Sequence, residues 1–339
     1  MNVIVKLPNE VNEKLLMIPF LTVLEELLRE IAHKDPEDDT YQIHLISTKK
    51  GIEVLNLIPF TAYYHEIDEE DLKSVFTVHR ACKHFTITNK LDCFISTTKG
   101  FVDASIGKNL NVKKTIGPEL GKNKWVLTHA VKVNEQAHLS DFPKPLLTAI
   151  ENENFELPNV SCRKLDPVYL DWNENPYYII DLPLTEEERI DPLWSELFEH
   201  LTNKRFVFIC SQLKPHLQND LIQEYIETLP QKNTYKIFKL DSYIDFAKLV
   251  SFSLGVATES KDLMTIASYC GALTHFINSG VDLKLIGPKY FRGELKDLKL
   301  EPEAFNTILD EVISYIELKT KKEEEEKPEQ KSQEDDLSK

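Results

Sequence analysis

The residues best suited to chemistry form a turn, Glu259-Ser260-Lys261-Asp262. A short β-prone stretch, 255–258, precedes this turn, and the apolar residues after it recur at helical spacing as far as Cys270. In an open parallel sheet, ligands bind where a strand ends and a helix begins, because the unpaired N–H groups and the positive dipole end of the helix converge there. The turn therefore predicts a ligand site. The alternative is that Ser260 or Thr258 only caps the helix and the two carboxylates balance its dipole.

The elements that position this turn follow an alternating pattern along the whole chain. Apolar spacing over 241–271 predicts helix, strand and helix, and the continuous apolar stretch 3–7 is typical of a strand buried in a parallel sheet. A helix with an inward face of Leu24, Leu27, Leu28 and Ile31 follows. The pattern predicts an α/β fold with doubly wound sheets. The other predicted strands are 41–46, 63–67, 92–96, 113–116, 177–181, 206–210, 235–240 and 283–286, and a closing helix buries Phe305, Ile308, Leu309, Val312, Ile313 and Ile316.

The length of 339 residues suits two domains of roughly 150 residues each. The alternation of strands and helices breaks between Asn134 and Asn175, where several prolines occur. We therefore predict a first domain at 1–150, a linker at 151–175 and a second domain at 176–318. The segment 319–339 is rich in Glu, Lys and Gln and predicts a disordered charged tail.

Composition excludes several classes of function. A net charge of −16 argues against nucleic-acid binding, which requires clustered Lys and Arg. No run of 18 apolar residues could span a membrane, and five cysteines without a CxxC pair or a signal peptide favour a reducing cytoplasm. Neither GxGxxG nor GxxxxGK[ST] occurs, so no dinucleotide cofactor or P-loop is expected.

The order of elements around the turn resembles the nucleotide-binding segment of glycosyltransferase family 9, the ADP-heptose:lipopolysaccharide heptosyltransferases. In that family a helix leads to an Asp-Ser-Gly turn, two further residues, a His and an Ala-rich helix. Here Glu259 stands at the Asp position, Ser260 is kept, Lys261 replaces the Gly and Met264 replaces the His. The resemblance runs over residues 1–318 and implies two Rossmann-like domains facing across a cleft, the B-type glycosyltransferase fold.

The N-terminal half carries the rest of the resemblance. The family has a Gly-Asp pair, with the Asp six residues before a Pro of the first helix, and Asn12-Glu13 stands there before Pro19. Ile116-Gly117 matches an Ile-Gly turn, and His138 matches a His before the linker helix. The resemblance therefore implies that Glu13 is the catalytic base and that Asn12 and His138 lie on the acceptor side of the cleft.

The activity that the resemblance implies is transfer of a heptose-like sugar from a nucleotide-diphosphate donor to a lipopolysaccharide-type or other glycoconjugate acceptor, with inversion and without a metal. Such a transfer needs a carboxylate to take the proton of the acceptor hydroxyl and positive charge to hold the departing diphosphate. Lys261 and Arg189 are the candidate cations, although Arg189 follows Glu186-Glu187-Glu188 and can pair with these acids instead. The acceptor implies a cytoplasmic enzyme with peripheral contact at the inner face of the membrane.

A different class of function stays open. Lys261 adds bulk where a phosphate would approach the backbone, and Glu259 with Asp262 places negative charge beside the helix end. These departures favour a catalytically inactive relative that serves as a binding or scaffold partner, with the tail as a tether to a protein. In that case Glu13 is only a first-turn acid that offsets a helix dipole.

The remaining chemically versatile residues give weaker signals. His79-x-x-Cys82-x-His84 has metal-ligating residue types, but no second cluster stands at zinc spacing, so no metal is expected. His216 begins a helix beyond a predicted strand and is expected to face the cleft. Cys210 and Cys270 are predicted to be small core residues.

Overall fold

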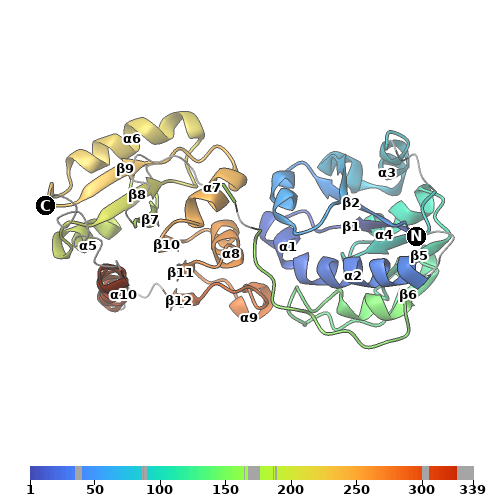
Figure 1. Ribbon diagram of the computed structural model, residues 1–339. Helices are drawn as coiled ribbons and strands as arrows, with labels where there is room; N and C mark the ends of the chain where they lie inside the picture. Colours follow the sequence, from blue (N-terminus) through green and yellow to red (C-terminus); the bar gives the residue numbers. More distant parts are fainter. Residues whose placement is uncertain are drawn as a thin grey trace, which may run out of the picture.

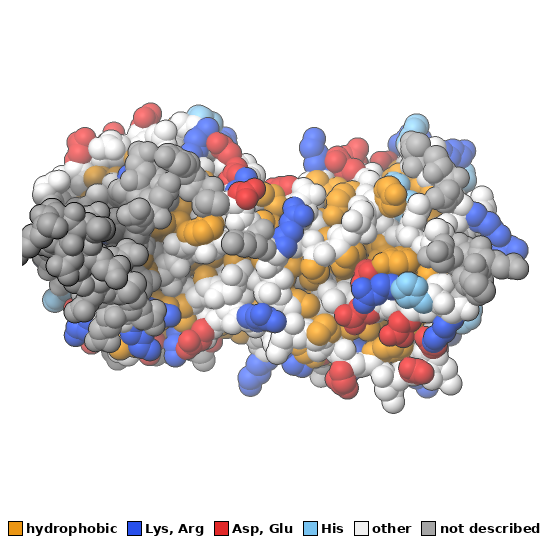
Figure 2. Space-filling view, in the orientation of Figure 1, with side chains coloured by type: hydrophobic (Ala, Val, Ile, Leu, Met, Phe, Trp, Pro, Cys, Tyr) orange, Lys and Arg blue, Asp and Glu red, His pale blue; other side chains and the backbone are white. Residues whose placement is uncertain are grey.

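The computed structural model describes residues 1–34, 40–85, 87, 90–163, 165–166, 176–185, 187, 189–299 and 305–326. In this part of the chain, two six-stranded parallel sheets covered by helices lie side by side (Figure 1). We call each sheet with its helices a domain, the first being N-terminal. The two lobes meet at a narrower waist (Figure 2). The predicted α/β fold with two Rossmann-like domains is confirmed.

The first domain has the strand order β3-β2-β1-β4-β5-β6. The central strand β1 is buried on both faces, as its continuous apolar sequence predicts. The sheet grows outward in both directions from the β1–β4 pair, so the C-terminal ends of these strands form a topological switch point. The strands are β1 (Asn2–Lys6), β2 (Gln42–Thr48), β3 (Tyr63–Ile67), β4 (Cys93–Ser96), β5 (Lys114–Pro118) and β6 (His129–Val131).

Helices cover both faces of this sheet. The short α1 leads almost directly into α2, whose Leu24, Leu27 and Leu28 are buried as predicted, while Ile31 is partly exposed. The α-helices are α1 (Val11–Leu16), α2 (Ile18–Lys34), α3 (Val75–Cys82) and α4 (Phe101–Asn109), and the 3₁₀ helices are η1 (Ile52–Leu57), η2 (Glu69–Lys73), η3 (Asn123–Trp125) and η4 (Lys144–Ala149).

The second domain repeats this plan with the strand order β12-β11-β10-β7-β8-β9, and its switch point lies between β7 and β10. Its strands are β7 (Tyr178–Asp181), β8 (Arg205–Ile209), β9 (Thr234–Ile237), β10 (Gly255–Thr258), β11 (Leu273–Asn278) and β12 (Leu295–Lys299). Its helices are η5 (Pro192–Trp194), α5 (Ser195–His200), α6 (Pro215–Glu227), α7 (Tyr243–Val250), α8 (Lys261–Tyr269), α9 (Leu283–Ile286) and α10 (Phe305–Glu326).

One predicted strand is wrong. Residues 283–286 form the short helix α9, because the Asp282 carboxylate accepts the N–H of Lys284 (3.0 Å) and caps the turn as a helix. Three apolar residues in a stretch of four do not distinguish a strand from a helix by periodicity. The strands that complete this side of the sheet are β11 and β12 instead.

The closing helix is longer than the sequence pattern predicts. Helix α10 continues to Glu326, so residues 319–326 of the predicted disordered tail are helical. Residues 327–339 of that tail lie outside the described residues. None of the described helices combines the length and the apolar character needed to cross a membrane.

The two domains pack against each other through α1, η1 and α9. Figure 1 shows α7, α8 and α9 on the side of the second domain that faces α1. The Tyr269 hydroxyl donates to the carbonyl of Leu57 (2.9 Å), and the N–H of Leu139 donates to the carbonyl of Leu285 (2.8 Å). A single cluster of buried apolar side chains continues from the first domain into the second, so the contact is a packed interface.

Part of the predicted linker is packed onto the second domain. Val160 pairs with Phe291 and donates its N–H to the carbonyl of Tyr290 (2.8 Å), while Cys162 donates its N–H to the carbonyl of Tyr269 (2.9 Å). Residues 164 and 167–175 of the predicted linker lie outside the described residues. We call residues 157–163 the connector.

A buried histidine in the second sheet predicts acid sensitivity. The ring of His275 is 1% exposed, its Nδ1 accepts the hydroxyl of Tyr178 (2.5 Å), and burial lowers its pKa to about 4. The unfolded chain binds this proton near pH 6.5, so stability is lost as the pH falls from 6.5 to 4, by about 3 kcal/mol from this group. Urea unfolding across that range should show a smaller loss for His275→Asn. An unchanged pH dependence in the variant would contradict this assignment.

Candidate functional site

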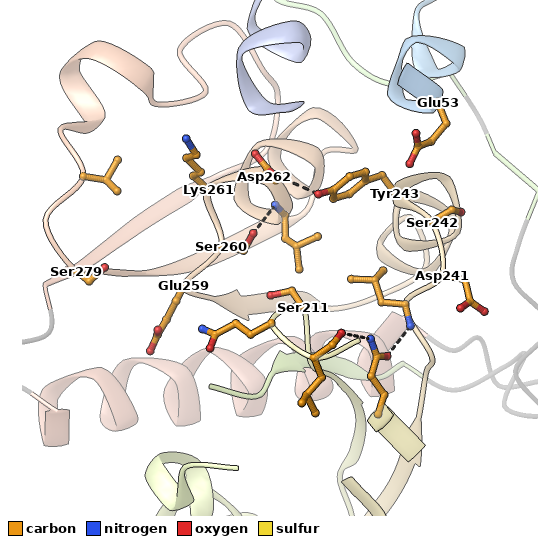
Figure 3. Close-up of a pocket in the computed structure, with 16 residues that line it drawn as sticks. Glu53, Ser211, Asp241, Ser242, Tyr243, Glu259, Ser260, Lys261, Asp262 and Ser279 are labelled. Atoms are coloured by element: carbon orange, nitrogen blue, oxygen red, sulfur yellow. Dashed lines mark hydrogen bonds between the residues drawn. The ribbon is translucent and has the colours of Figure 1, made fainter. Parts of the chain in front are cut away.

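A cavity of about 660 Å³ lies at the C-terminal ends of the second sheet, where strands give way to helices. Five parts of the second domain line it: residues 211–213 after β8, Gln218 of α6, residues 240–243 leading into α7, residues 259–263 leading into α8, and residues 279 and 281 after β11. Glu53 of η1 is the lining residue from the first domain among those described (Figure 3). The predicted ligand turn therefore lies in a cavity between the two domains.

A buried carboxylate organises the floor of this region. Asp181 ends β7 at the switch point and is 5% exposed. It accepts the N–H and the hydroxyl of Ser211 (2.8 and 2.7 Å) and the hydroxyl of Thr258 (2.7 Å). Burial raises the pKa of this carboxyl, and the three hydrogen bonds oppose that rise. Asp181 thus ties together the ends of β7, β8 and β10.

The turn before α8 is built as the capping alternative predicts. The Ser260 hydroxyl accepts the N–H of Leu263 (3.4 Å), and the Ser260 N–H donates to the hydroxyl of Thr258 (2.9 Å). Ser260 is therefore the N-cap of α8, and it lines the cavity as well. In Figure 3, Lys261 and Glu259 extend in opposite directions from Ser260.

The cavity carries more negative than positive charge. Among the described lining residues, Lys261 is the cation, and the acids are Glu53, Asp241, Glu259 and Asp262. Burial, followed by the charges of Asp181 and Asp191, raises the pKa of Glu259. Lys261 forms no ion pair with another described residue, so its ammonium group is available to a ligand.

Asp262 connects the cavity to the first domain. Its Oδ1 accepts the backbone N–H of Asn12 in α1 (3.1 Å), and its Oδ2 accepts the hydroxyl of Tyr243 (3.3 Å). The side-chain Oδ1 of Asn12 is buried without a hydrogen-bond donor. The hydrogen bond between Asn12 and Asp262 places Asn12, the neighbour of Glu13 in the chain, directly against the first turn of α8.

Glu13 lies in the first turn of α1 and is partly buried at this interface. Burial raises the pKa of its carboxyl, and the negative charges of Glu10 and Asp262 add to the rise, while the positive charges of Lys261 and Lys6 oppose it. Glu13 does not line the cavity itself. It stands beside it, within the electrostatic reach of Lys261.

Two buried lysines near α1 were not predicted from the sequence. Lys6 is fully buried at the end of β1, where its ammonium donates to the carbonyl of Leu7 and to Oδ1 of Asn9 (2.9 Å) and lies 3.8 Å from Asp103. Burial lowers the pKa of Lys6, and it lowers the pKa of Lys14 to about 8. The position of Lys6 at the end of an otherwise apolar strand, directly after Val5, is the sequence signal that could have identified it as a buried lysine.

Several predicted site residues lie elsewhere. His138 is buried and donates from Nε2 to the carbonyl of Gly287 in the second domain (2.7 Å), while its Nδ1 accepts the N–H of the neighbouring Ser140 (3.1 Å). Both ring nitrogens are therefore occupied, and the first of these bonds links the two domains. Arg189 has a side chain that is 79% exposed and lies 3.8 Å from Glu187, away from the cavity lining. His216 is exposed on α6, and Met264 is fully buried.

Metal-ligating side chains do not converge in the part of the chain that the structure describes. No three His, Cys, Asp or Glu side chains there lie close enough together to hold an ion. In the His79-x-x-Cys82-x-His84 segment, His79 Nδ1 lies 3.2 Å from Oδ1 of Asn109, and the Cys82 thiol is buried with a pKa raised to about 12.

Two parallel doubly wound domains with a cavity at their facing edges define the B-type glycosyltransferase fold. The chain is similar to the solved structure of E. coli heptosyltransferase WaaC with ADP, at 12% identity and a TM-score of 0.67, over 92% of this chain and 99% of that chain. It is also similar to a family 9 glycosyl transferase from Veillonella parvula, at 14% identity and a TM-score of 0.62, over 91% of this chain and 90% of that chain. A third similar structure is E. coli ADP-heptose lipopolysaccharide heptosyltransferase II, at 12% identity and a TM-score of 0.64, over 96% of this chain and 100% of that chain. No protein-family model and no curated protein matches the sequence. The likeness shows the fold and confirms the predicted resemblance at that level.

Proposed function

We propose that the protein is a glycosyltransferase that moves a heptose-like sugar from a nucleotide-diphosphate donor to a glycoconjugate acceptor. The observation that carries the proposal is the Asn12–Asp262 hydrogen bond, because it brings Glu13 of the first domain to the helix end that borders the cavity. The family resemblance implies that the Asn12-Glu13 pair and the turn at the start of α8 lie together, although they are about 250 residues apart in the chain.

The donor is assigned to the cavity. Its volume of about 660 Å³ lies within the usual range for small-molecule sites. A structural neighbour was solved with ADP and another structure of the same enzyme with ADP-2-deoxy-2-fluoro heptose, which supports a nucleotide sugar as donor. Lys261 and the first N–H groups of α8 supply the positive end that a diphosphate needs.

Glu13 is assigned as the general base. In the proposed reaction, the acceptor oxygen forms a bond to the anomeric carbon while the bond from that carbon to the diphosphate breaks on the opposite face, which inverts the centre. The acceptor proton passes to the Glu13 carboxylate, and Lys261 offsets the charge of the leaving diphosphate. A raised pKa makes this carboxylate a stronger base than an exposed glutamate.

The first domain is assigned to the acceptor. Glu13 projects from α1 of that domain, so the attacking hydroxyl must approach from the same side. A lipopolysaccharide-type acceptor would place the protein in the cytoplasm, in peripheral contact with the inner face of the membrane. His138 and Arg189 take no part in this mechanism, since the first bridges the domains and the second lies outside the cavity.

Donor binding can be tested without knowing the acceptor. Calorimetric titration with ADP, UDP, GDP and their sugars should show binding of at least one at micromolar to millimolar strength. Ser260→Trp should abolish this heat, because the indole would fill the cavity beside α8. Thr228→Trp is the matched control, since Thr228 is exposed at the C-terminal end of α6 and does not line the cavity, so this variant should bind as the wild type does. No heat with any nucleotide at millimolar concentration would favour the inactive scaffold instead.

A further inference from the structure

Two of the five cysteines lie side by side at the connector. Cys82, Cys93 and Cys210 are buried, whereas Cys162 and Cys270 are partly exposed. The N–H of Cys162 donates to the carbonyl of Tyr269 (2.9 Å), which aligns the connector with the C-terminal end of α8. Because Cys270 follows Tyr269 in the chain, this backbone hydrogen bond places Cys162 beside Cys270, and each thiol is the largest influence on the pKa of the other. Cys210 is buried as predicted, and Cys270 packs against the apolar core as predicted but stays partly exposed.

The pKa values of the two thiols are shifted in opposite directions. The neighbouring Cys270 thiol and the positive charge of Arg163 lower the pKa of Cys162, while the Cys162 thiol raises the pKa of Cys270. Burial raises the pKa of Cys93 to about 12 and that of Cys210 to about 11. Because the thiolate is the reactive form, Cys162 is the cysteine best prepared to react with an oxidant, and Cys270 stands next to it as a resolving thiol.

We propose that Cys162 and Cys270 form a reversible oxidative modification site, at which a hydroperoxide converts the two thiols into a disulfide. The Cys162 thiolate attacks the terminal oxygen of the peroxide, the O–O bond breaks, and Cys162 becomes a sulfenic acid while water or an alcohol leaves. The sulfur of Cys270 then attacks the sulfur of Cys162 and displaces water. The two sulfurs lose two electrons and the peroxide gains them. A dithiol such as dithiothreitol reverses the change.

The cross-link would fasten the connector to the helix that carries the cavity. Cys270 caps the C-terminal end of α8, and Ser260 caps its N-terminal end in the cavity. The bond would close a loop from residue 162 to residue 270, which covers most of the second domain. It would therefore restrict the unfolded chain strongly and hold the connector in its packed position.

The test uses the full chain treated with a small excess of hydrogen peroxide. Peptide mapping without reduction should show one link, between Cys162 and Cys270, together with the loss of two titratable thiols, both restored by dithiothreitol. The melting temperature should rise by roughly 5 to 10 °C on oxidation. Before oxidation, iodoacetamide at pH 7 should modify Cys162 at least about tenfold faster than Cys82, Cys93 or Cys210.

The matched variants separate this site from general oxidation. Cys162→Ser and Cys270→Ser should each abolish the link and the rise in melting temperature, whereas Cys210→Ser should keep both. A link that joins other cysteines would overturn the proposal. So would oxidation of Cys162 to the sulfinic acid with Cys270 left as a free thiol, because the neighbouring thiol would then not have resolved the sulfenic acid.

Discussion

Glu13→Gln should lower the rate of sugar transfer by roughly a hundred- to ten-thousandfold while the affinity for the donor stays near that of the wild type. The amide keeps the size of the side chain but cannot accept the proton of the acceptor hydroxyl. Donor affinity should persist because Glu13 stands beside the cavity rather than in its lining. The rate is measured as donor consumption in the presence of a glycoconjugate acceptor, and the affinity by calorimetry.

Two further variants sharpen this test. Glu13→Asp keeps a carboxylate and restores the residue of the family, so it should retain or improve the rate. Glu10→Gln is the matched control, because Glu10 lies one turn away and pairs with Lys50 at 2.7 Å, and the proposed reaction assigns it no proton transfer. Its negative charge adds to the raised pKa of Glu13, so this variant should change the rate only slightly. If Glu13→Gln transfers sugar as fast as Glu10→Gln does, Glu13 is only a first-turn acid, and both changes should alter stability by less than about 1 kcal/mol.

The pH dependence of the rate gives an independent check. A general base works in its ionised form, so the rate should rise with pH until the Glu13 carboxyl is fully ionised. Because burial raises the pKa of this carboxyl, the rise should extend to higher pH than an exposed glutamate would give. Glu13→Gln should remove this limb of the profile.

The helices and strand that surround the candidate site are predicted well from the sequence, because the local spacing of apolar residues is enough to identify such elements. The helix, strand and helix around the turn appear as α7, β10 and α8, and Ser260 lies at the cap where helical spacing begins. The placement of Glu13 within electrostatic reach of Lys261 depends on the packing of α1 against α8, two helices far apart in the chain. Only the family resemblance predicted it, since no local pattern encodes a contact between positions so far apart.

The parts that could not be predicted depend on tertiary partners. Leu283–Ile286 becomes a helix because Asp282 caps it, and β12 is a strand because it pairs with β11 at the edge of the sheet. His138 matches the family position, yet the carbonyl of Gly287 in the other domain decides its role. A sequence pattern assigns residue types to positions, but it does not supply the groups that surround them.

The hydrogen-bond partners of Asp181 also could not be predicted from the sequence. Replacing Asp181 should have a large effect on stability. Asp181→Ala should lower the free energy of unfolding by about 3 kcal/mol, because the N–H and hydroxyl of Ser211 and the hydroxyl of Thr258 lose a buried acceptor. The variant should also lose nucleotide binding, since the loops after β8 and β10 that line the cavity are tied to this carboxylate. Asp220→Ala on the exposed face of α6 is the control and should change neither quantity.

Asp181→Asn separates the shape of this side chain from its charge. Burial raises the pKa of the Asp181 carboxyl above that of the unfolded chain, so the folded protein binds its proton more tightly. Stability from this group is then fully present below the unfolded pKa near 3.9 and is lost as the pH rises through the folded value. The advantage of the wild type over Asp181→Asn in urea unfolding should therefore shrink as the pH rises from 4 to 7. A difference that grows with pH over this range would mean that the three hydrogen bonds outweigh burial, and that Asp181 stabilises the strand ends as a carboxylate.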